Sequence, residues 1–415
     1  MKKLIVTILA ILVVLSSALA TDKRVQALGN DPYMLPGDDA SIQLFPQRIN
    51  DMNLVYFRDV HLASPDYLLV VGDPGKTWGF YGGSTEKDDY INVLRSLGSK
   101  SAIRLGGRFG IIRDSSLDDD KEAPPTTDEF SLSKLNMMMD FEFGMDMGDT
   151  EFSTNLSFGL TPDDINALVG ALTTPHGSYF REVKSGASTT KDEGKASKLS
   201  FVLQTKARAK KGLFFFDNSY ALFGIGYQGS SSEYTAANTK IEDQSEGAFS
   251  IYSSYHLFNN QNLANDKIFL VYGLGGLMNF SRTADENLLS GSESKDTDMS
   301  FGIVAPVFNI GLEAKLKYAS LRFGMERMIT SLGYSSSTQV YKSGLVDDED
   351  TQSSFVLGAN GIYNYNAGMG FNYGDLKLDV LINNNFWLMG PQMLFSGDPA
   401  VFGTFAICAD IVYMF

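Results

Sequence analysis

The feature that most constrains the fold is an alternation of apolar and polar side chains with a period of two residues. In the stretch 134–145, KLNMMMDFEFGM, Met139 and Phe141 lie on one parity while Asp140 and Glu142 lie on the other. Successive side chains of a β-strand point to opposite faces, so the pattern predicts strands with one apolar and one polar face. Segments of about 10 residues with this period are typical of the strands of transmembrane β-barrels.

The connections between these segments point to the same architecture. Tight links follow residues 145, 209, 258, 315 and 366, and long polar links follow residues 112, 160, 227, 280, 328 and 383. Short periplasmic turns that alternate with long extracellular loops are typical of outer-membrane barrels. We therefore predict an all-β fold, a transmembrane antiparallel up-and-down β-barrel of about 14 strands. The predicted strands are 53–59, 66–83 (broken near Pro74), 100–112, 134–145, 150–160, 197–209, 213–227, 246–258, 266–280, 300–315, 316–328, 353–366, 369–383 and 401–415.

The beginning of the sequence predicts export. Lys2 and Lys3 precede an apolar run, and Ala18-Leu19-Ala20 follows it, which together predict a cleaved signal peptide over residues 1–20. An uncleaved membrane anchor is the alternative. Cys408 is the only cysteine, so no internal disulfide can stabilise the exported chain. The formal net charge of −15 argues against nucleic-acid binding, which needs a basic face.

The last strand resembles the C-terminal targeting signal of Gram-negative outer-membrane proteins. Phe415, Tyr413 and Ile411 share one parity, which we expect to face lipid. The sequence departs from the signal at Asp410, where a glycine is common. The resemblance implies recognition of this strand by the barrel-assembly machinery.

The segment before the first predicted strand carries a second resemblance. Ala27-Leu28-Gly29 and Asp38-Asp39 resemble the N-terminal segment of the long-chain fatty-acid transporter family of outer-membrane proteins and its relatives associated with protein secretion. Phe45-Pro46-Gln47 stands where that family has Asn-Pro-Ala. The resemblance implies a roughly 14-stranded barrel with its N-terminal segment in the lumen. The expected division is a signal peptide (1–20), an N-terminal luminal or periplasmic segment (21–52) and the barrel (53–415).

The polar parity of the strands supplies candidate residues for a solute path. Rings of lysine and arginine are one way in which pores select anionic solutes, and the sequence predicts passage of a small or amphipathic solute across the outer membrane. Alternatively, these charges pair across a closed lumen, and the barrel is a structural or secretion-associated scaffold. The candidate luminal residues are Arg104, Arg108, Asp140, Glu142, Lys198, Lys206, Arg208, Arg322 and Glu326.

Two further readings are weaker. A soluble exported β-protein would also contain alternating strands. Ser254 and His256 share one parity, but no third residue that would orient a catalytic base is identifiable, so we predict no enzymatic activity and no catalytic residues.

Acidic segments account for much of the negative charge, namely 114–129, 290–298 and 347–352, and all fall in predicted extracellular loops. Carboxylates bind hard cations, so a nonspecific divalent cation that bridges lipopolysaccharide is one role for them. None has the spacing of a calcium loop, and solvated loops are the alternative. We predict no cofactor and no dedicated metal site, and the expected partners are outer-membrane lipid and lipopolysaccharide.

Overall fold

A computed structural model of the protein describes most of the chain after the predicted signal peptide, which itself lies outside the described residues. The described residues are 22–29, 32–35, 41–58, 60, 66–82, 91–120, 126–160, 177–185, 188–236, 239–289, 292–343, 346–382 and 407–415.

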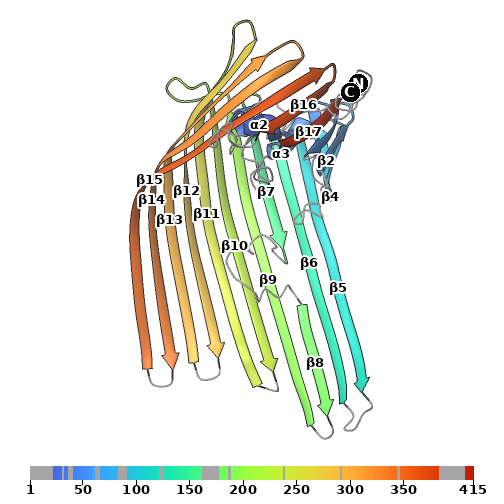
Figure 1. Ribbon diagram of the computed structural model, residues 1–415, viewed down its shortest axis with the longest axis vertical. Helices are drawn as coiled ribbons and strands as arrows, with labels where there is room; N and C mark the ends of the chain where they lie inside the picture. The colour runs from blue at the N-terminus through green and yellow to red at the C-terminus, as the bar shows by residue number, and fades with distance from the viewer. Residues whose placement is uncertain are drawn as a thin grey trace, which may run out of the picture.

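The strands form one antiparallel sheet that closes on itself (Figure 1). With one exception, strands that are neighbours in the chain pair with each other, and the first pairs with the last, with Leu54 opposite Met414. All 17 strands belong to this sheet. They are β1 (Leu54–Arg58), β2 (Asp66–Val71), β3 (Trp78–Gly82), β4 (Ile91–Gly98), β5 (Ser101–Asp120), β6 (Thr126–Asp146), β7 (Thr150–Gly159), β8 (Gly177–Ser185), β9 (Ser188–Ala209), β10 (Asn218–Ala236), β11 (Thr239–Leu263), β12 (Ile268–Leu289), β13 (Ser292–Lys315), β14 (Ala319–Ser343), β15 (Val346–Tyr373), β16 (Leu376–Ile382) and β17 (Ile407–Met414).

The predicted closed antiparallel up-and-down β-barrel is confirmed, but its strand number differs from the predicted one. β7 and β8 occupy one position in the wall, because each pairs with β6 on one side and with β9 on the other. The circumference therefore contains 16 strands, not about 14. The sequence interpretation did not identify β4 or β8.

Several predicted loops and one predicted turn are wrong. Of the three acidic segments, residues 114–120 lie in β5, 126–129 in β6, 292–298 in β13 and 347–352 in β15, because strands continue beyond the segments with an apolar face. The backbone hydrogen bonds that join these acidic stretches to neighbouring strands do not require apolar side chains. The tight link predicted after residue 366 is also misplaced, since β15 runs to Tyr373 and the turn contains Gly374, whose φ of +64° suits glycine.

The wall has very different heights around the barrel (Figure 1). The strands β5, β6 and β9–β15 contain 19 to 28 residues. The described parts of β16, β17 and β1–β4 contain only 5 to 8. The ring of described strands is complete only near the C-terminus, which we call the closed end, and the long strands extend from it toward the far end.

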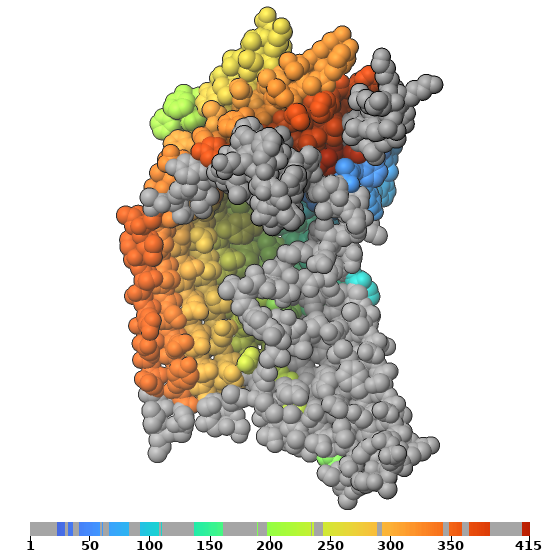
Figure 2. Space-filling model, in the orientation of Figure 1, coloured from blue at the N-terminus to red at the C-terminus, as the bar shows by residue number. Residues whose placement is uncertain are grey.

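The two faces of the wall differ in polarity. Along β14, Leu321 and Phe323 are 52% and 43% exposed, whereas Arg322 between them is 6% exposed. The apolar parity therefore points outward and the polar parity points into the lumen. Figure 2 shows the strands β13–β15 packed side by side into a continuous wall.

The N-terminal segment, by which we mean the described residues from Asp22 to Met52, packs against this inner face. It contains the short helices α2 (Asp22–Ala27), η1 (Pro32–Met34), α3 (Ser41–Leu44) and η2 (Pro46–Asn50). Helices this short are not stable alone and need tertiary packing. No helix among the described residues has the length and apolarity needed to cross a membrane.

Two clusters of buried apolar side chains join the N-terminal segment to the barrel. In one, Ile49 packs with Leu54 of β1 and Val412 of β17, and all three are fully buried. In the other, Tyr33 packs with Phe258 of β11. The core of the molecule therefore lies at the closed end, between the segment and the wall.

Candidate functional site

Buried charges connect the N-terminal segment to the strands β13, β14 and β16. Arg322 donates through Nε to Glu313 Oε1 over 2.6 Å and also pairs with Asp379. Arg24 of α2 donates through Nη2 to Glu313 Oε2 over 2.8 Å. Gly370 makes room for the pair of Arg322 and Asp379, since a Cβ at this position would meet both the guanidinium and the carboxylate. This cluster fastens α2 to the wall.

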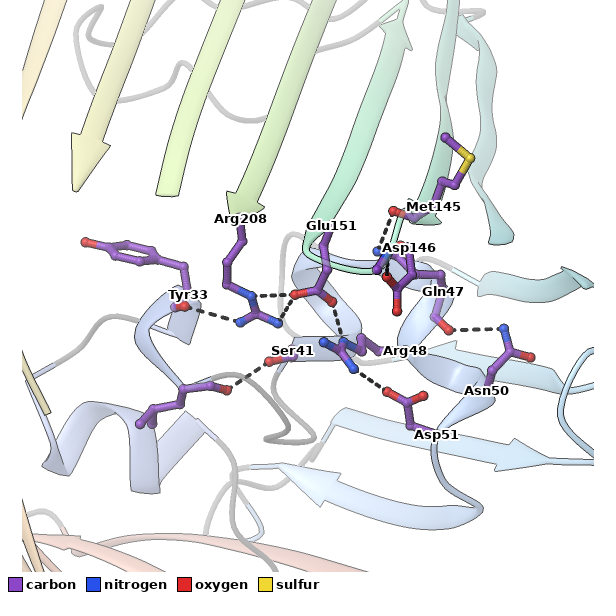
Figure 3. Close-up of polar contacts among 12 residues, drawn as sticks. Tyr33, Ser41, Gln47, Arg48, Asn50, Asp51, Met145, Asp146, Glu151 and Arg208 are labelled. Carbon is purple, nitrogen blue, oxygen red and sulfur yellow. Dashed lines mark hydrogen bonds and ion pairs between the residues drawn. The ribbon is translucent and has the colours of Figure 1, made fainter. Parts of the chain in front are cut away.

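A second cluster fastens η2 to the strands β7 and β9 (Figure 3). Glu151 of β7 lies between two arginines, because Arg48 of η2 pairs with one carboxylate oxygen and Arg208 of β9 donates through Nε to the other over 2.6 Å. Arg208 also donates to the backbone oxygen of Tyr33 over 3.2 Å. One carboxylate thus joins the segment to the wall.

The electrostatics of Arg48 favour this arrangement. Burial on its own lowers the pKa of its guanidinium, but hydrogen bonds and charges from Glu151 and Asp51 outweigh burial, so the pKa lies above its ordinary value. Arg48 Nη1 donates to Asp51 Oδ2 over 2.6 Å, within the same segment. Arg48 therefore remains charged at any physiological pH.

A third cluster lies within the wall itself. Glu142 of β6 is fully buried, and its Oε2 forms an ion pair with Arg104 Nη2 over 2.8 Å. Its Oε1 accepts from Lys206 Nζ over 3.3 Å and from the hydroxyl of Ser153. Gln47 of η2 reaches the same strand, where its side-chain amide donates to the backbone oxygen of Met145 over 3.3 Å. One buried carboxylate is thus the shared partner of an arginine and a lysine of the wall.

Asp410, where the C-terminal strand departs from the expected glycine, has a structural role. Its carboxylate is fully buried and accepts from the backbone N–H of Lys23 over 3.2 Å and from the hydroxyl of Tyr56 over 3.3 Å. A glycine could not accept these bonds. The departure from the motif therefore marks a contact between β17 and the N-terminal segment.

The three residues of the proposed C-terminal signal lie on the outward parity of β17. Tyr413 and Phe415 are 47% and 56% exposed, with ring centroids 6.1 Å apart, whereas Val412, directly before Tyr413, is fully buried. Ile411 is half-buried and pairs with Phe57 of β1. Recognition of these residues during assembly remains a prediction.

Glycines form a recess in the inner wall where α2 ends. Gly311, Gly324 and Gly368 lie on the neighbouring strands β13, β14 and β15, and a Cβ at any of them would contact residues 27–29 at less than normal van der Waals distance. These positions therefore need glycine because another chain segment lies directly on them.

Replacing Gly324 with valine is expected to displace the end of α2, because overpacking of this kind costs about 1–3 kcal/mol. Trypsin cleavage after Arg24 should accelerate. Gly333→Val is the matched control on the same strand, since the nearest atom to a Cβ at that position is a backbone oxygen 4.0 Å away. Equal cleavage of both variants would show that the recess does not hold α2.

Five of the nine predicted luminal residues lie in the three charged clusters described above. Arg104, Glu142 and Lys206 form the wall cluster, while Arg208 and Arg322 belong to the clusters that hold the N-terminal segment. Each of these four cations, Arg104, Lys206, Arg208 and Arg322, therefore has a carboxylate partner at the closed end.

The other four predicted residues belong to none of these clusters. Asp140, Lys198 and Glu326 are half-buried on their strands, and the side chain of Arg108 lies outside the described part. Contact of the nine residues with a solute stays a prediction.

Sequence reasoning missed the partners of these charges. Glu151 and Glu313 stand on the inward parity, which was a usable signal. Arg24 and Arg48 lie in short helices without a strand pattern, so nothing in the sequence pointed to their pairing with the wall.

His256 has a packing role at the closed end. Its ring centroid lies 4.8 Å from that of Tyr33, which in turn stacks on Tyr220 at 4.1 Å. The imidazole of His256 thus contacts the N-terminal segment. The parity that placed Ser254 beside His256 does not by itself assemble a catalytic site.

Neither a metal site nor a similarity to known proteins assigns a function to these clusters. Among the described residues, no group of three or more His, Cys, Asp or Glu side chains could hold a metal ion. No model of a known protein family matches the sequence, and no curated protein matches it significantly.

Proposed function

We propose that the protein is an outer-membrane β-barrel of a Gram-negative bacterium, through which a small or amphipathic solute passes. The opposite polarity of the two faces of the wall carries this proposal. An apolar outer face suits the hydrocarbon core of a bilayer, and a polar inner face suits a hydrated lumen. Outer-membrane lipid and lipopolysaccharide would surround the wall.

In this proposal the N-terminal segment acts as a plug at the closed end. Its contacts with the wall are ion pairs, hydrogen bonds and packing, with no covalent link, so it can be displaced without unfolding the barrel. The proposed membership in the long-chain fatty-acid transporter family is compatible with this arrangement, but it is supported only by the short N-terminal motifs. The polar inner face does not favour a purely apolar solute.

A closed, non-transporting scaffold is the second candidate. The observation that favours it is the strength of the attachment, because Glu151 and Glu313 each bind an arginine of the segment and an arginine of the wall. Such a plug need never open. A scaffold role associated with secretion would then use only the outer surface of the barrel.

Single-channel recording in planar bilayers distinguishes the two. We expect discrete conductance from the wild-type protein, or conductance that appears only when Gly324→Val loosens the plug. Either result supports passage, and the second identifies the plug as a gate. A silent wild type together with a silent variant, both with the gel mobility of folded barrels, would favour the scaffold.

A further inference from the structure

A band of hydroxyl groups crosses the inner wall beyond the N-terminal segment. The register aligns five serines on consecutive strands, β11 to β15, each directly opposite the next. They are Ser250, Ser281, Ser300, Ser335 and Ser354. The side chains of directly opposite residues share one face of a sheet, so the five hydroxyls form one band.

The register also shows that this band faces the lumen. Arg208 of β9 points inward, because it contacts Tyr33 of the N-terminal segment. Val202 lies six residues before Arg208 and therefore on the same face. Val202 is opposite Gly226 of β10, which is opposite Ser250, without a register shift along this path.

A hollow lies along the band in the wall that β12 to β15 form. These four strands stand on the left in Figure 1. It has a volume of about 400 Å³, within the range of small-molecule sites in proteins. Four of the five serines line the hollow, namely Ser281, Ser300, Ser335 and Ser354. Asp298 and Gln352 also line it, each two residues farther from the closed end than the serine on its own strand.

The lining chemistry selects among ligand classes. Hydroxyls and an amide both donate and accept hydrogen bonds, and a carboxylate accepts several. No lysine or arginine lines the hollow, so an anionic ligand would find no counter-charge there, and Met299 is the only apolar residue of the lining. A bound metal ion would need more carboxylates than Asp298 supplies.

The hydroxyls retain bonding capacity for a ligand. Ser281 and Ser300 share one hydrogen bond of 2.7 Å, and so do Ser335 and Ser354. A serine hydroxyl has one donor and two acceptor sites, so each pair keeps a donor and further acceptors. Such a surface matches a ligand whose own groups alternate between donor and acceptor, which is the property of sugar hydroxyls.

We propose that this hollow binds a neutral polyhydroxylated solute, an oligosaccharide, inside the lumen. The inference deepens the proposed passage function, on which it rests, by naming the class of solute. An oligosaccharide would replace the anionic solute that luminal lysines and arginines suggest, since Arg104, Arg208 and Arg322 of that set are paired with carboxylates at the closed end.

The test is calorimetric titration of the full-length protein with maltohexaose, in a detergent without a sugar headgroup. S335V/S354V removes one hydroxyl pair, and we expect it to weaken binding about tenfold, because the ligand loses its hydrogen bonds to both serines. T338V/T351V is the matched control, because these threonines form a 3.2 Å hydroxyl pair on the same two strands but on the outward parity. Gln352→Leu is a second test variant and should also weaken binding.

Each outcome bears on a defined claim. Binding by the wild type and by T338V/T351V, weakened in both test variants, supports the site. Absence of binding to the wild type, or equal binding by all folded variants, overturns it. Bilayer recordings with the same proteins separate the two proposals: binding without conductance sinks passage and leaves the site, whereas conductance without binding sinks the site and leaves passage. If maltohexaose reduces the current in these recordings, a polyethylene glycol of similar size is the control that separates binding from steric block.

Discussion

Replacing Arg322 with leucine is expected to lower the free energy of unfolding by about 3–5 kcal/mol, the usual cost of removing one partner from a buried ion pair. The side chain of Arg322 is 4% exposed and bridges Glu313 and Asp379, which are 4% and 1% exposed. Glu313 keeps Arg24 as a partner, but Asp379 loses the guanidinium that neutralises it. Chemical unfolding of the protein in lipid vesicles, followed by gel mobility without boiling, measures the effect.

Two comparisons make the Arg322 result specific. Lys342→Leu removes a cation from the same strand, but its pair with Glu293 spans 3.7 Å and is 50% and 37% exposed. A change of about 0–1 kcal/mol is expected there. R322L/D379N should recover part of the loss, because the buried carboxylate is then no longer charged. If Arg322→Leu costs no more than Lys342→Leu, the buried cluster does not stabilise the closed end.

The architecture could be predicted from the sequence because barrel strands leave a local signal. Each strand that crosses an apolar band needs one apolar face, and stretches such as 134–145 show it directly. Beyond that band the signal disappears while the strand continues. Residues 347–352 are acidic and read as a loop, yet they pair with β14 in register. Strand length therefore could not be read from hydrophobic periodicity.

The polar clusters could be predicted only in part. Parity places Glu313 and Arg322 on the inner face, but their partners depend on register and on empty space. Arg322 reaches Asp379 because Gly370 leaves room between them. A single sequence does not reveal which glycine provides such room, nor that a short helix brings Arg24 to the same carboxylate.

Replacing Glu151 with glutamine is expected to release η2 from the wall. The change keeps the shape of the side chain but leaves Arg48 and Arg208 side by side without their shared carboxylate. Arg48 retains Asp51 in its own segment, and Arg208 retains the backbone oxygen of Tyr33. Repulsion between the two guanidinium groups thus replaces the link between segment and wall.

Trypsin reports this release, because it cleaves after arginine and Arg48 is 18% exposed in the attached state. Loss of a buried partner costs about 3–5 kcal/mol, and cleavage of a transiently open segment follows the population of the open state, so cleavage after Arg48 should accelerate at least about a hundredfold. Bilayer recordings of the same variant should show longer or more frequent open events if the segment blocks the lumen.

A double variant distinguishes charge repulsion from a general loss of packing. E151Q/R208M removes one of the two arginines that shared Glu151, so it should be cleaved more slowly than Glu151→Gln alone if repulsion drives the release. Glu293→Gln, which alters an exposed pair on β13, should leave cleavage after Arg48 unchanged. Faster cleavage in the double variant would mean that Arg208 holds the segment by its contacts with Tyr33 and with the ring of Phe45, 4.8 Å from the guanidinium, rather than through Glu151.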